Sequence, residues 1–300
     1  MKKSFLPAII ILISLLTLTG NCFLTAQVDE VKSSGQKENF RPEHIMFNVS
    51  DPRAMIKWYC GNLGMVVVRK GTAPTYSSFI ADSGKHMMLE LGNFAEYPRM
   101  DFAKIDLNSM HLAFAVNDIK QMKEKLIAAG ATVAQDLFKT PGGDQVMVLR
   151  DPWGLAIQFV ERVDPMFKYT GIRMEHLEFN VLDTHKKAKW YEENLDMKVM
   201  REGGAPTFNM FISDPEHNMM MELNQNTDFP VLDFWKISHM ATHFAFTVND
   251  IQAVKKKLIA AGAKLVEDIN KTPGGDLVIM MRDPWGLPIQ FVHRIDPMLK

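Results

Sequence analysis

The sequence predicts an α+β fold of four βαβββ units in two tandem domains, which follow an N-terminal signal segment. Two observations predict the domains: a long segment repeats at a constant spacing, and a weaker strand and helix pattern occurs twice within each copy. The 300 residues are 47% apolar and 23% charged, which is typical of a globular protein. The net charge of −1 lacks the basic excess of a nucleic-acid-binding protein.

The first 26 residues are predicted to be a signal peptide. Lys2 and Lys3 form a positively charged start, Phe5 to Leu18 is an almost unbroken apolar run, and small and polar residues follow. We place the cleavage site after Ala26. Residues 27–40 are mostly polar and are predicted to be a linker.

Two alternatives stay open for this segment. Cys22 is a candidate lipoprotein cysteine, and the uncharged stretch is long enough to anchor the chain in a bilayer if it stays uncleaved. All three interpretations predict an exported protein, periplasmic or extracellular, because the lysines stay inside. After cleavage only Cys60 remains, so no intrachain disulfide is expected.

An internal repeat divides the rest of the chain into two halves. The segment "EHIMFNV" at Glu43 returns as "EHLEFNV" at Glu175, 132 residues later, and "KTPGGD" and "RDPWGL" return with the same offset. The halves align without a gap as residues 41–168 and 173–300. Each half has the size of a typical domain.

The first unit of the first half begins with a strand at 44–49, where apolar and polar residues alternate. Asp51 can cap a helix with Pro52 at its first position, and this helix is expected to run to about Asn62. Three further strands are expected at 65–69, 75–81 and 86–91.

The second unit repeats this order. A strand is expected at 110–116, and Asp118 then caps a helix with one apolar face that ends at Gly130. "TPGG" and "DPWG" are predicted turns between the last strands. These strands are expected at 131–136, 145–150 and 155–160.

Each half places four polar side chains within apolar strands. Strand alternation lets them share one face, where burial without partners would cost several kcal/mol each. Convergence on a divalent ion would satisfy all four, and hydrogen-bonded structural residues are the alternative that the pattern leaves open. The residues are His44, Glu90, His111 and Gln158 in the first half and His176, Glu222, His243 and Gln290 in the second.

The segments "HIMFNV", "WYCGNLGM", "MMLEL", "HLAFAV" and "RDPWGLAIQFVER", in this strand order, resemble the vicinal oxygen chelate superfamily. It includes glyoxalase I, glyoxalase/bleomycin-resistance proteins, methylmalonyl-CoA epimerase and extradiol dioxygenases. The resemblance covers nearly all of residues 41–300 and implies two tandem glyoxalase-like domains. It also implies metal ligands on the first and fourth strand of each unit, which are the eight residues above. One divalent ion per site is expected, from among Ni, Co, Zn, Mn and Fe.

The resemblance implies a metal-dependent lyase or isomerase, which acts on a small substrate with vicinal oxygens through a metal-bound enediolate. Glyoxalase I usually has a glutamate as its base at the last ligand position. Here Gln158 and Gln290 stand there, and glutamine cannot accept a proton at neutral pH. Glu90 and Glu222 are therefore the expected catalytic bases. This departure, together with export, argues against glyoxalase I itself.

Two other functions stay open. One is a metal-free protein of the bleomycin-resistance type, which sequesters a small molecule. The other is an Fe(II) dioxygenase of the extradiol type. In each case the expected partner is a small molecule rather than a nucleic acid, and no membrane partner is expected beyond the N-terminal anchor. The two halves are expected to form an internal pseudo-dimer, which is compatible with a monomer.

The grouping of the eight residues is also open. The first expectation is one site within each half, and the alternative combines His44 and Glu90 with His243 and Gln290, because the family forms sites across dimers. Glu178 replaces Met46 beside a ligand histidine, so it is either a base private to the second half or a solvated strand residue. Four further residues are candidates for substrate contact, with structural hydrogen bonds as the alternative for the asparagines: Asn48, Asn180, Tyr76 and Phe208.

Overall fold

The structure is a computed structural model that describes residues 38–205 and 207–299. The predicted signal peptide with Cys22, and residues 27–37 of the predicted linker, lie outside the described residues. Among the described helices, none has the length and apolar character that crossing a membrane requires.

Each half of the chain folds as two βαβββ units, which confirms the predicted order. A short 3-10 helix precedes the second unit of each half: η1 (Phe102–Lys104) and η2 (Phe234–Lys236). The first unit consists of β1 (Arg41–Asn48), α1 (Pro52–Leu63), β2 (Val66–Arg69), β3 (Ser78–Ala81) and β4 (Met88–Gly92). The second consists of β5 (Met110–Ala115), α2 (Ile119–Ala128), β6 (Thr132–Lys139), β7 (Gln145–Arg150) and β8 (Ala156–Glu161).

The second half repeats these elements at equivalent positions. The third unit consists of β9 (Arg173–Asn180), α3 (Thr184–Leu195), β10 (Lys198–Glu202), β11 (Phe208–Ser213) and β12 (Met220–Gln225). The fourth consists of β13 (Thr242–Thr247), α4 (Ile251–Ala260), β14 (Lys264–Lys271), β15 (Leu277–Arg282) and β16 (Pro288–His293).

Local side-chain chemistry fixes the helix starts. All four α-helices begin after an aspartate whose carboxylate accepts a hydrogen bond from a backbone N–H of the first turn, which confirms the caps predicted at Asp51 and Asp118. The strand predicted from residue 75 begins only at Ser78. The chain turns before it, because the backbone N–H of Tyr76 donates to the carbonyl of Thr72 and Tyr76 has a φ of 50°.

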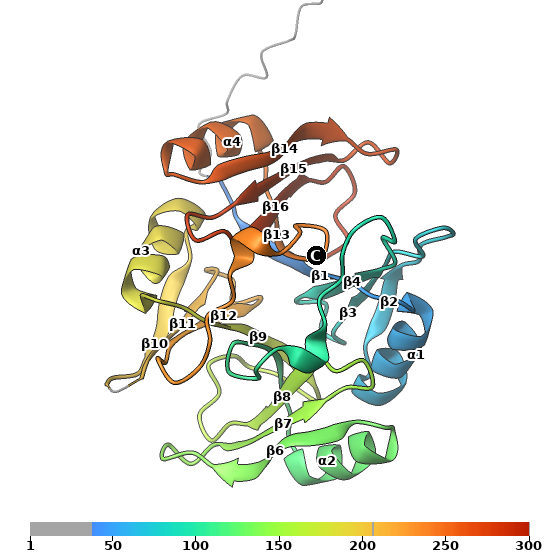
Figure 1. The fold of residues 1–300 in the computed structure, drawn as a ribbon, viewed down its shortest axis with the longest axis vertical. Coiled ribbons are helices and arrows are strands. Elements are labelled where there is room, and N and C mark those ends of the chain that lie inside the picture. The colour runs from blue at the N-terminus through green and yellow to red at the C-terminus, as the bar shows by residue number, and fades with distance from the viewer. Residues whose placement is uncertain (1–37, 206, 300) are drawn as a thin grey trace, which may run out of the picture. The chain divides into compact units, whose positions relative to one another are not determined.

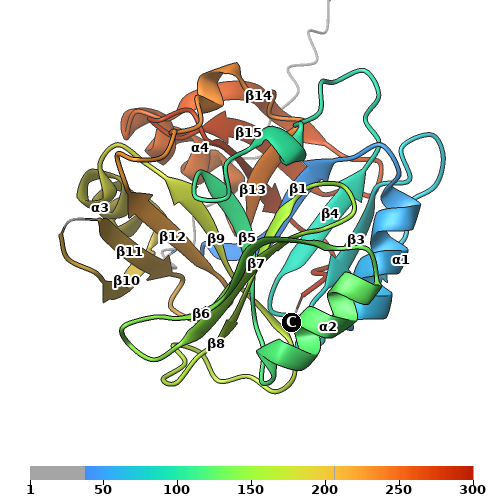
Figure 2. The ribbon, with the colours of Figure 1, turned by 60° about the horizontal axis from the view of Figure 1, so that its bottom comes forward.

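The strands form two eight-stranded sheets, and each sheet combines units from both halves. The first has the order β14-β15-β16-β13-β1-β4-β3-β2, and the second has the order β10-β11-β12-β9-β5-β8-β7-β6. The halves join where β1 pairs antiparallel with β13 and where β5 pairs antiparallel with β9. Figures 1 and 2 show these strands at the centre of the described chain and the four helices toward its periphery. The first unit thus completes a sheet with the fourth, and the second with the third.

The two faces of the central strands differ in chemistry. One face packs into an apolar cluster that contains an equivalent phenylalanine from each unit: Phe47, Phe114, Phe179 and Phe246. The opposite face of β1 carries His44 and Met46, which alternate with the core residues Ile45 and Phe47. The sheets therefore bury an apolar core on one side and present the predicted ligand residues on the other.

Candidate metal centres

The first sheet brings four ligand-type residues to one face of four adjacent strands. His44 on β1 is level with Gln290 on β16, with one residue of β13 between them. Glu90 on β4 is level with His243 on β13, with Met46 of β1 between them. Residues in register on neighbouring strands project to the same face, as do residues two apart on one strand. All four side chains therefore belong to the same face.

Three of these side chains lie close enough to share an ion. His44, Glu90 and His243 each offer one ligand atom, and these atoms lie within 4.8 Å of one another; we call this group site 1. Nε2 of His44 lies 3.3 Å from Oε2 of Glu90, and the two imidazole ring centroids are 5.6 Å apart. Gln290 and Glu90 line a common pocket of about 620 Å³. Site 1 thus opens to a space large enough for a small molecule.

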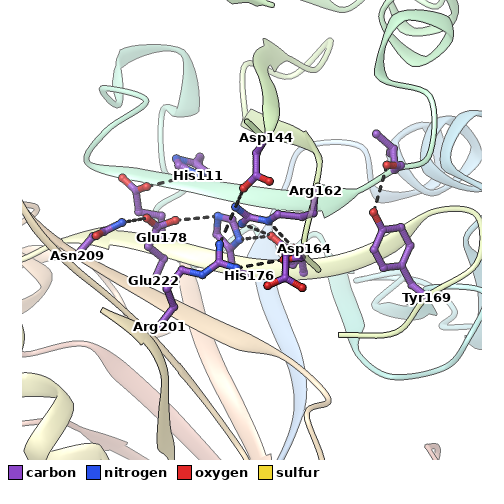
Figure 3. A network of polar contacts seen from close by, with 12 residues as sticks. His111, Asp144, Arg162, Asp164, Tyr169, His176, Glu178, Arg201, Asn209 and Glu222 are labelled. Carbon is purple, nitrogen blue, oxygen red and sulfur yellow. Dashed lines mark hydrogen bonds and ion pairs between the residues drawn. The ribbon is translucent and has the colours of Figure 1, made fainter. Parts of the chain in front are cut away.

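The second sheet repeats this arrangement. His111, His176 and Glu222 offer ligand atoms within 4.8 Å of one another, and we call this group site 2. Nε2 of His176 lies 3.1 Å from Oε2 of Glu222, and the imidazole centroids are 5.5 Å apart. Gln158 on β8 is level with His176, with one residue of β5 between them. Figure 3 shows the histidines and carboxylates of site 2 converging from different strands.

The expectation of one site within each half is wrong. Each group of ligand-type residues instead combines side chains from both halves, as in the alternative. His44 and Glu90 lie in the first sheet, whereas His111 and Gln158 lie in the second. The reason is the pairing of β1 with β13 and of β5 with β9, which places one unit of each half in each sheet. That the eight residues bind metal ions stays a prediction.

Nδ1 of each of the four histidines lies within hydrogen-bond distance of an oxygen. Nδ1 of His44 and Nδ1 of His176 each lie 2.9 Å from a carboxylate oxygen of the preceding glutamate. Nδ1 of His243 lies 2.9 Å from the carbonyl oxygen of His239, and His111 is held in the same way by Leu107. Because these oxygens can only accept, each Nδ1 carries the proton and donates. In the neutral rings, the lone pair is then on Nε2.

The Nε2 atoms of the four histidines are positioned to bind a metal ion. Nε2 of all four histidines is buried and has no hydrogen-bond partner within the described part of the chain. A buried polar atom without a hydrogen bond needs an explanation, and a bound metal ion would be one. Two imidazoles and a carboxylate, with an amide oxygen nearby, are donors that suit a borderline divalent ion. The donor set and the unpaired nitrogens therefore both fit a metal centre.

Two glutamates that the sequence interpretation missed hold the first histidine of each site. The guanidinium of Arg294 binds Glu43 at 2.7 and 2.6 Å, and Arg162 binds Glu175 at 3.0 and 2.7 Å. Burial raises the pKa of Glu43, but hydrogen bonds from Arg294 and His44 outweigh burial and lower this pKa to about 2. The glutamates therefore stay charged, and each orients its histidine ring by accepting a hydrogen bond from Nδ1. The signal was the dipeptide "EH", which both halves contain.

The two histidines of each site differ in acidity. Burial lowers the pKa of His243 to about 4, and the charge of His44 adds to this effect. Burial likewise lowers the pKa of His111 to about 4. For His44, burial also disfavours the charged form, but Glu43 and Glu90 outweigh it and raise the pKa. Burial thus favours the neutral, metal-binding form of His243 and His111, whereas the raised pKa of His44 makes a proton a stronger competitor for its ring.

The predicted catalytic glutamates each have one oxygen fixed and one directed at a histidine. The hydroxyl of Ser77 donates to Oε1 of Glu90, and Nδ2 of Asn209 donates to Oε1 of Glu222 at 3.2 Å. Burial raises the pKa of Glu90, but the nearby imidazole of His44 outweighs burial, so the net pKa is lowered. Oε2 of each carboxylate is the atom that faces Nε2 of the histidine.

Glu178 is buried beside site 2. Its side chain is 4% exposed, so the interpretation as a solvated strand residue is wrong. Oε2 of Glu178 lies 3.5 Å from Nε2 of His111, and Figure 3 shows its carboxylate next to Glu222. Burial and the charge of Glu222 raise the pKa of Glu178 well above its usual range. The equivalent residue at site 1 is Met46, so the two sites are chemically different.

The asparagines predicted to contact substrate hold loops instead. The amide nitrogen of Asn48 donates to the carbonyls of Phe94 and Tyr97, and its amide oxygen accepts from the N–H of Phe94. Asn180 makes equivalent bonds after β12. These contacts match the structural alternative that the sequence left open.

The two predicted aromatic residues lie away from the ligand groups. Tyr76 lines a separate pocket beside α1, and Phe208 packs against His185. Phe79 instead packs edge-on against His44, with ring centroids 5.1 Å apart, and Phe211 packs in the same way against His176. The reason for the first difference is the late start of β3, which leaves Tyr76 in the preceding turn.

Comparison with known proteins gives a consistent family match. The family model of the Glyoxalase/Bleomycin resistance protein/Dioxygenase superfamily matches residues 41–159 and again residues 173–291. A probable chloroplastic lactoylglutathione lyase of Arabidopsis thaliana is 24% identical over 294 residues, which are 93% of this chain and 80% of that protein. A lactoylglutathione lyase of Haemophilus influenzae is 26% identical over 124 residues, 39% of this chain and 90% of that protein.

Solved structures share the fold. Glyoxalase I from Zea mays superposes with a TM-score of 0.70 at 20% sequence identity, covering 85% of this chain and 93% of that one. A putative dioxygenase from Bacillus subtilis superposes with a TM-score of 0.63 at 14% identity, covering 88% of each chain. At these identities the similarity concerns the fold alone.

Proposed function

Because this chain belongs to the Glyoxalase/Bleomycin resistance protein/Dioxygenase superfamily, we propose that it is a divalent-metal-dependent lyase or isomerase. Sites 1 and 2 each hold one ion, and the substrate is a small molecule with vicinal oxygens. One observation carries the proposal: at both sites, two buried Nε2 atoms that make no hydrogen bond lie within 4.8 Å of a carboxylate oxygen and of each other. A metal-free cleft would leave these buried nitrogens without hydrogen bonds, which is costly, whereas one ion would satisfy both nitrogens of a site.

The proposed reaction requires residues that hold the ion and a residue that accepts a proton. His44, Glu90 and His243 hold the ion at site 1, with Gln290 at its edge, and the equivalent residues do so at site 2. A divalent ion bound there supplies Lewis-acid polarisation of a substrate carbonyl. The mechanism then needs a base next to the carbon that carries the acidic proton.

Glu90 and Glu222 are the proposed bases. Gln158 and Gln290 cannot accept a proton at neutral pH, which leaves the carboxylates as the acceptors within each group. Ser77 and Asn209 hold one oxygen of each carboxylate and leave the other directed inward. To receive a proton, this inward oxygen would have to leave the ion, and the fixed oxygen would keep the carboxylate oriented while it does so.

The pocket of site 1 also contains a cation for an anionic substrate. Arg69 lines the pocket together with Glu90 and Gln290, and its side chain is 44% exposed. Its nearest acidic partner is Asp276 at 3.8 Å, which is a loose contact. The substrate class we propose is therefore a small hydroxy- or oxo-acyl compound with vicinal oxygens and a negative charge.

The relatives suggest a concrete probe. They are described as lactoylglutathione lyases, and lactoylglutathione is a 2-hydroxyacyl thioester with vicinal oxygens and carboxylates. We propose lactoylglutathione and the hemithioacetal of methylglyoxal with glutathione as the first compounds to assay, with each of Ni, Co, Zn, Mn and Fe. Turnover that needs a metal, and that is lost in a Glu90→Gln/Glu222→Gln variant with the metal content of the wild type, supports the proposed bases.

A dioxygenase is the second candidate, because each site has two histidines and one glutamate. This set is the facial triad of non-haem Fe(II) oxygenases when positions remain open on the ion. Oxygen consumption by the Fe(II)-loaded protein with a catechol would favour it. Isomerase turnover with a redox-inert ion such as Zn²⁺ would favour the lyase instead.

We also propose that the chain is exported, which the basic start and apolar run of residues 1–26 support. N-terminal sequencing of the protein recovered from cell fractions tests this. A mature chain that starts at Gln27 supports a cleaved signal peptide, and a chain that starts with a lipid-modified Cys22 supports the lipoprotein alternative. An intact Met1 in the membrane fraction supports the anchor, whereas an intact chain in the cytoplasm contradicts export.

Metal analysis tests the proposed function before any substrate is known. Protein purified without chelator should contain about two divalent ions per chain, one for each group of ligands. The His44→Ala/His176→Ala variant removes one ligand from each site and should lose both. A folded protein without metal, even after reconstitution, would contradict the proposal and favour a metal-free binding protein.

A further inference from the structure

We infer that Glu178 adds a second carboxylate to site 2, so that the two sites differ in affinity and site 2 takes up a divalent cation first. This inference rests on the proposed function, since it requires an ion at each site. It assigns Glu178 a role in cation binding that Met46 cannot perform at site 1.

The sheet register places Glu178 between two residues of site 2. On β9, Glu178 is paired with His111 of β5 on one side and with Glu222 of β12 on the other. It also lies two residues after His176 on the same strand, so all four side chains project to one face. Figure 3 shows the carboxylates of Glu178 and Glu222 next to each other.

The amide of Asn224 lies beside Glu178, but among the described residues no lysine or arginine pairs with this buried carboxylate. The residue is 4% exposed, and its Oε1 has no hydrogen bond within the described residues. Its Oε2 lies 3.5 Å from Nε2 of His111, which is the nitrogen directed at the proposed metal position. A buried carboxylate without a partner is strongly unfavourable, and a cation at site 2 supplies that partner.

Site 1 provides an internal reference. Met46 lies between Glu90 and His243 in the same register that Glu178 has between Glu222 and His111. Site 1 therefore offers one carboxylate, and site 2 offers two. Two carboxylates balance the charge of a divalent ion, and the ion offsets the burial and the charge of Glu222 that otherwise disfavour the ionised form of Glu178. The second carboxylate therefore favours the ion whether it contacts it directly or through a water molecule.

Two reciprocal substitutions, Glu178→Met at site 2 and Met46→Glu at site 1, test the inference through their effect on Co²⁺ affinity. Metal-free protein is titrated with Co²⁺, and binding is followed by calorimetry and by the visible absorption of the ion. His243→Ala reports site 2 alone, and His111→Ala reports site 1 alone. In the His243→Ala background, Glu178→Met should weaken Co²⁺ binding by about tenfold or more. In the His111→Ala background, Met46→Glu should strengthen it.

The controls separate failure of the inference from failure of the proposed function. Glu178→Gln keeps the side-chain shape and should weaken binding as Glu178→Met does, which separates charge from packing. Equal affinities at the two sites, unchanged by Glu178→Gln, would overturn the inference and leave the proposed function standing. No Co²⁺ binding at either site of the folded wild-type chain would overturn both.

Discussion

The imidazole rings of His44 and His243 lie 5.6 Å apart between their centroids, although they come from different halves of the chain. The antiparallel pairing of β1 with β13 brings them together, and the pairing of β5 with β9 does the same for His111 and His176. Neither half of the repeat contains a complete ligand set of its own. Under the proposed function, each metal ion would therefore be bound by residues of both halves.

Removal of metal should destabilise the protein. An ion that binds the folded state alone stabilises it by about 2.7 kcal/mol when its free concentration is a hundred times its dissociation constant. Addition of a chelator should therefore lower the melting temperature, and reconstitution should restore it. The His44→Ala/His176→Ala variant is the control, and its melting temperature should not respond to chelator. An unresponsive wild-type protein would contradict metal binding at both sites.

Replacement of Glu43, which hydrogen-bonds to His44, should weaken metal binding at site 1. Glu43 accepts a hydrogen bond from Nδ1–H of His44 and is bound by the guanidinium of Arg294. Glu43→Gln should reduce the metal affinity of site 1 by about 10- to 100-fold, as is typical for partners of ligand histidines. Competition with a chromophoric chelator measures this loss. Glu175→Gln is the matched variant and should affect site 2 instead, whereas an equal effect of each variant on both sites would argue against the assignment.

Asp151 should make stability depend on pH. Burial raises the pKa of its carboxyl to about 6, even though the hydroxyl of Tyr59 and backbone N–H groups donate to it. Since the folded pKa lies above the ordinary value of 3.8, the stabilising contribution is complete below pH 3.8 and is lost as the pH rises through 6. The loss amounts to about 3 kcal/mol. Asp151→Asn should remove this loss. The unfolding free energy of the variant minus that of wild type should therefore rise by about 3 kcal/mol from pH 4 to pH 7.

The second half offers the control for this prediction. Asp283 is equivalent to Asp151, but its carboxylate pairs with the buried ammonium of Lys187 at 3.0 Å, where the first half has Met55. Asp283→Asn leaves that cation unpaired and should destabilise the protein by about 3–5 kcal/mol. Urea denaturation at pH 4 and pH 7 measures both variants. An unfolding free energy that changes equally with pH in wild type and Asp151→Asn would refute the assignment.

The sequence was sufficient for the units and for the candidate residues. Capping aspartates, apolar helix faces and alternating strands depend on neighbours in the chain, so the βαβββ order and the start of α1 could be predicted. His44 and Glu90 stood out as polar residues in apolar strands, and both belong to a group that can hold a metal ion. Local patterns therefore identify which residues share a face.

The partner of each strand could not be predicted. β5 and β13 carry the similar segments "HLAFAV" and "HFAFTV", so alternation allows β1 to pair with either one. Long-range packing decides between them, and with it decides which histidine joins His44. The burial of Glu178 was hidden for a similar reason, because strand periodicity places it on the ligand face without showing that the face is enclosed.

The metal content of two double variants decides whether each site combines the two halves. His44→Ala/His243→Ala removes two ligands from site 1 and none from site 2, so the folded variant should retain about one ion per chain. His44→Ala/His111→Ala removes one ligand from each site and should lose both ions. The reverse result, with both ions lost in the first variant and one retained in the second, would place each site within one half and contradict the arrangement described here.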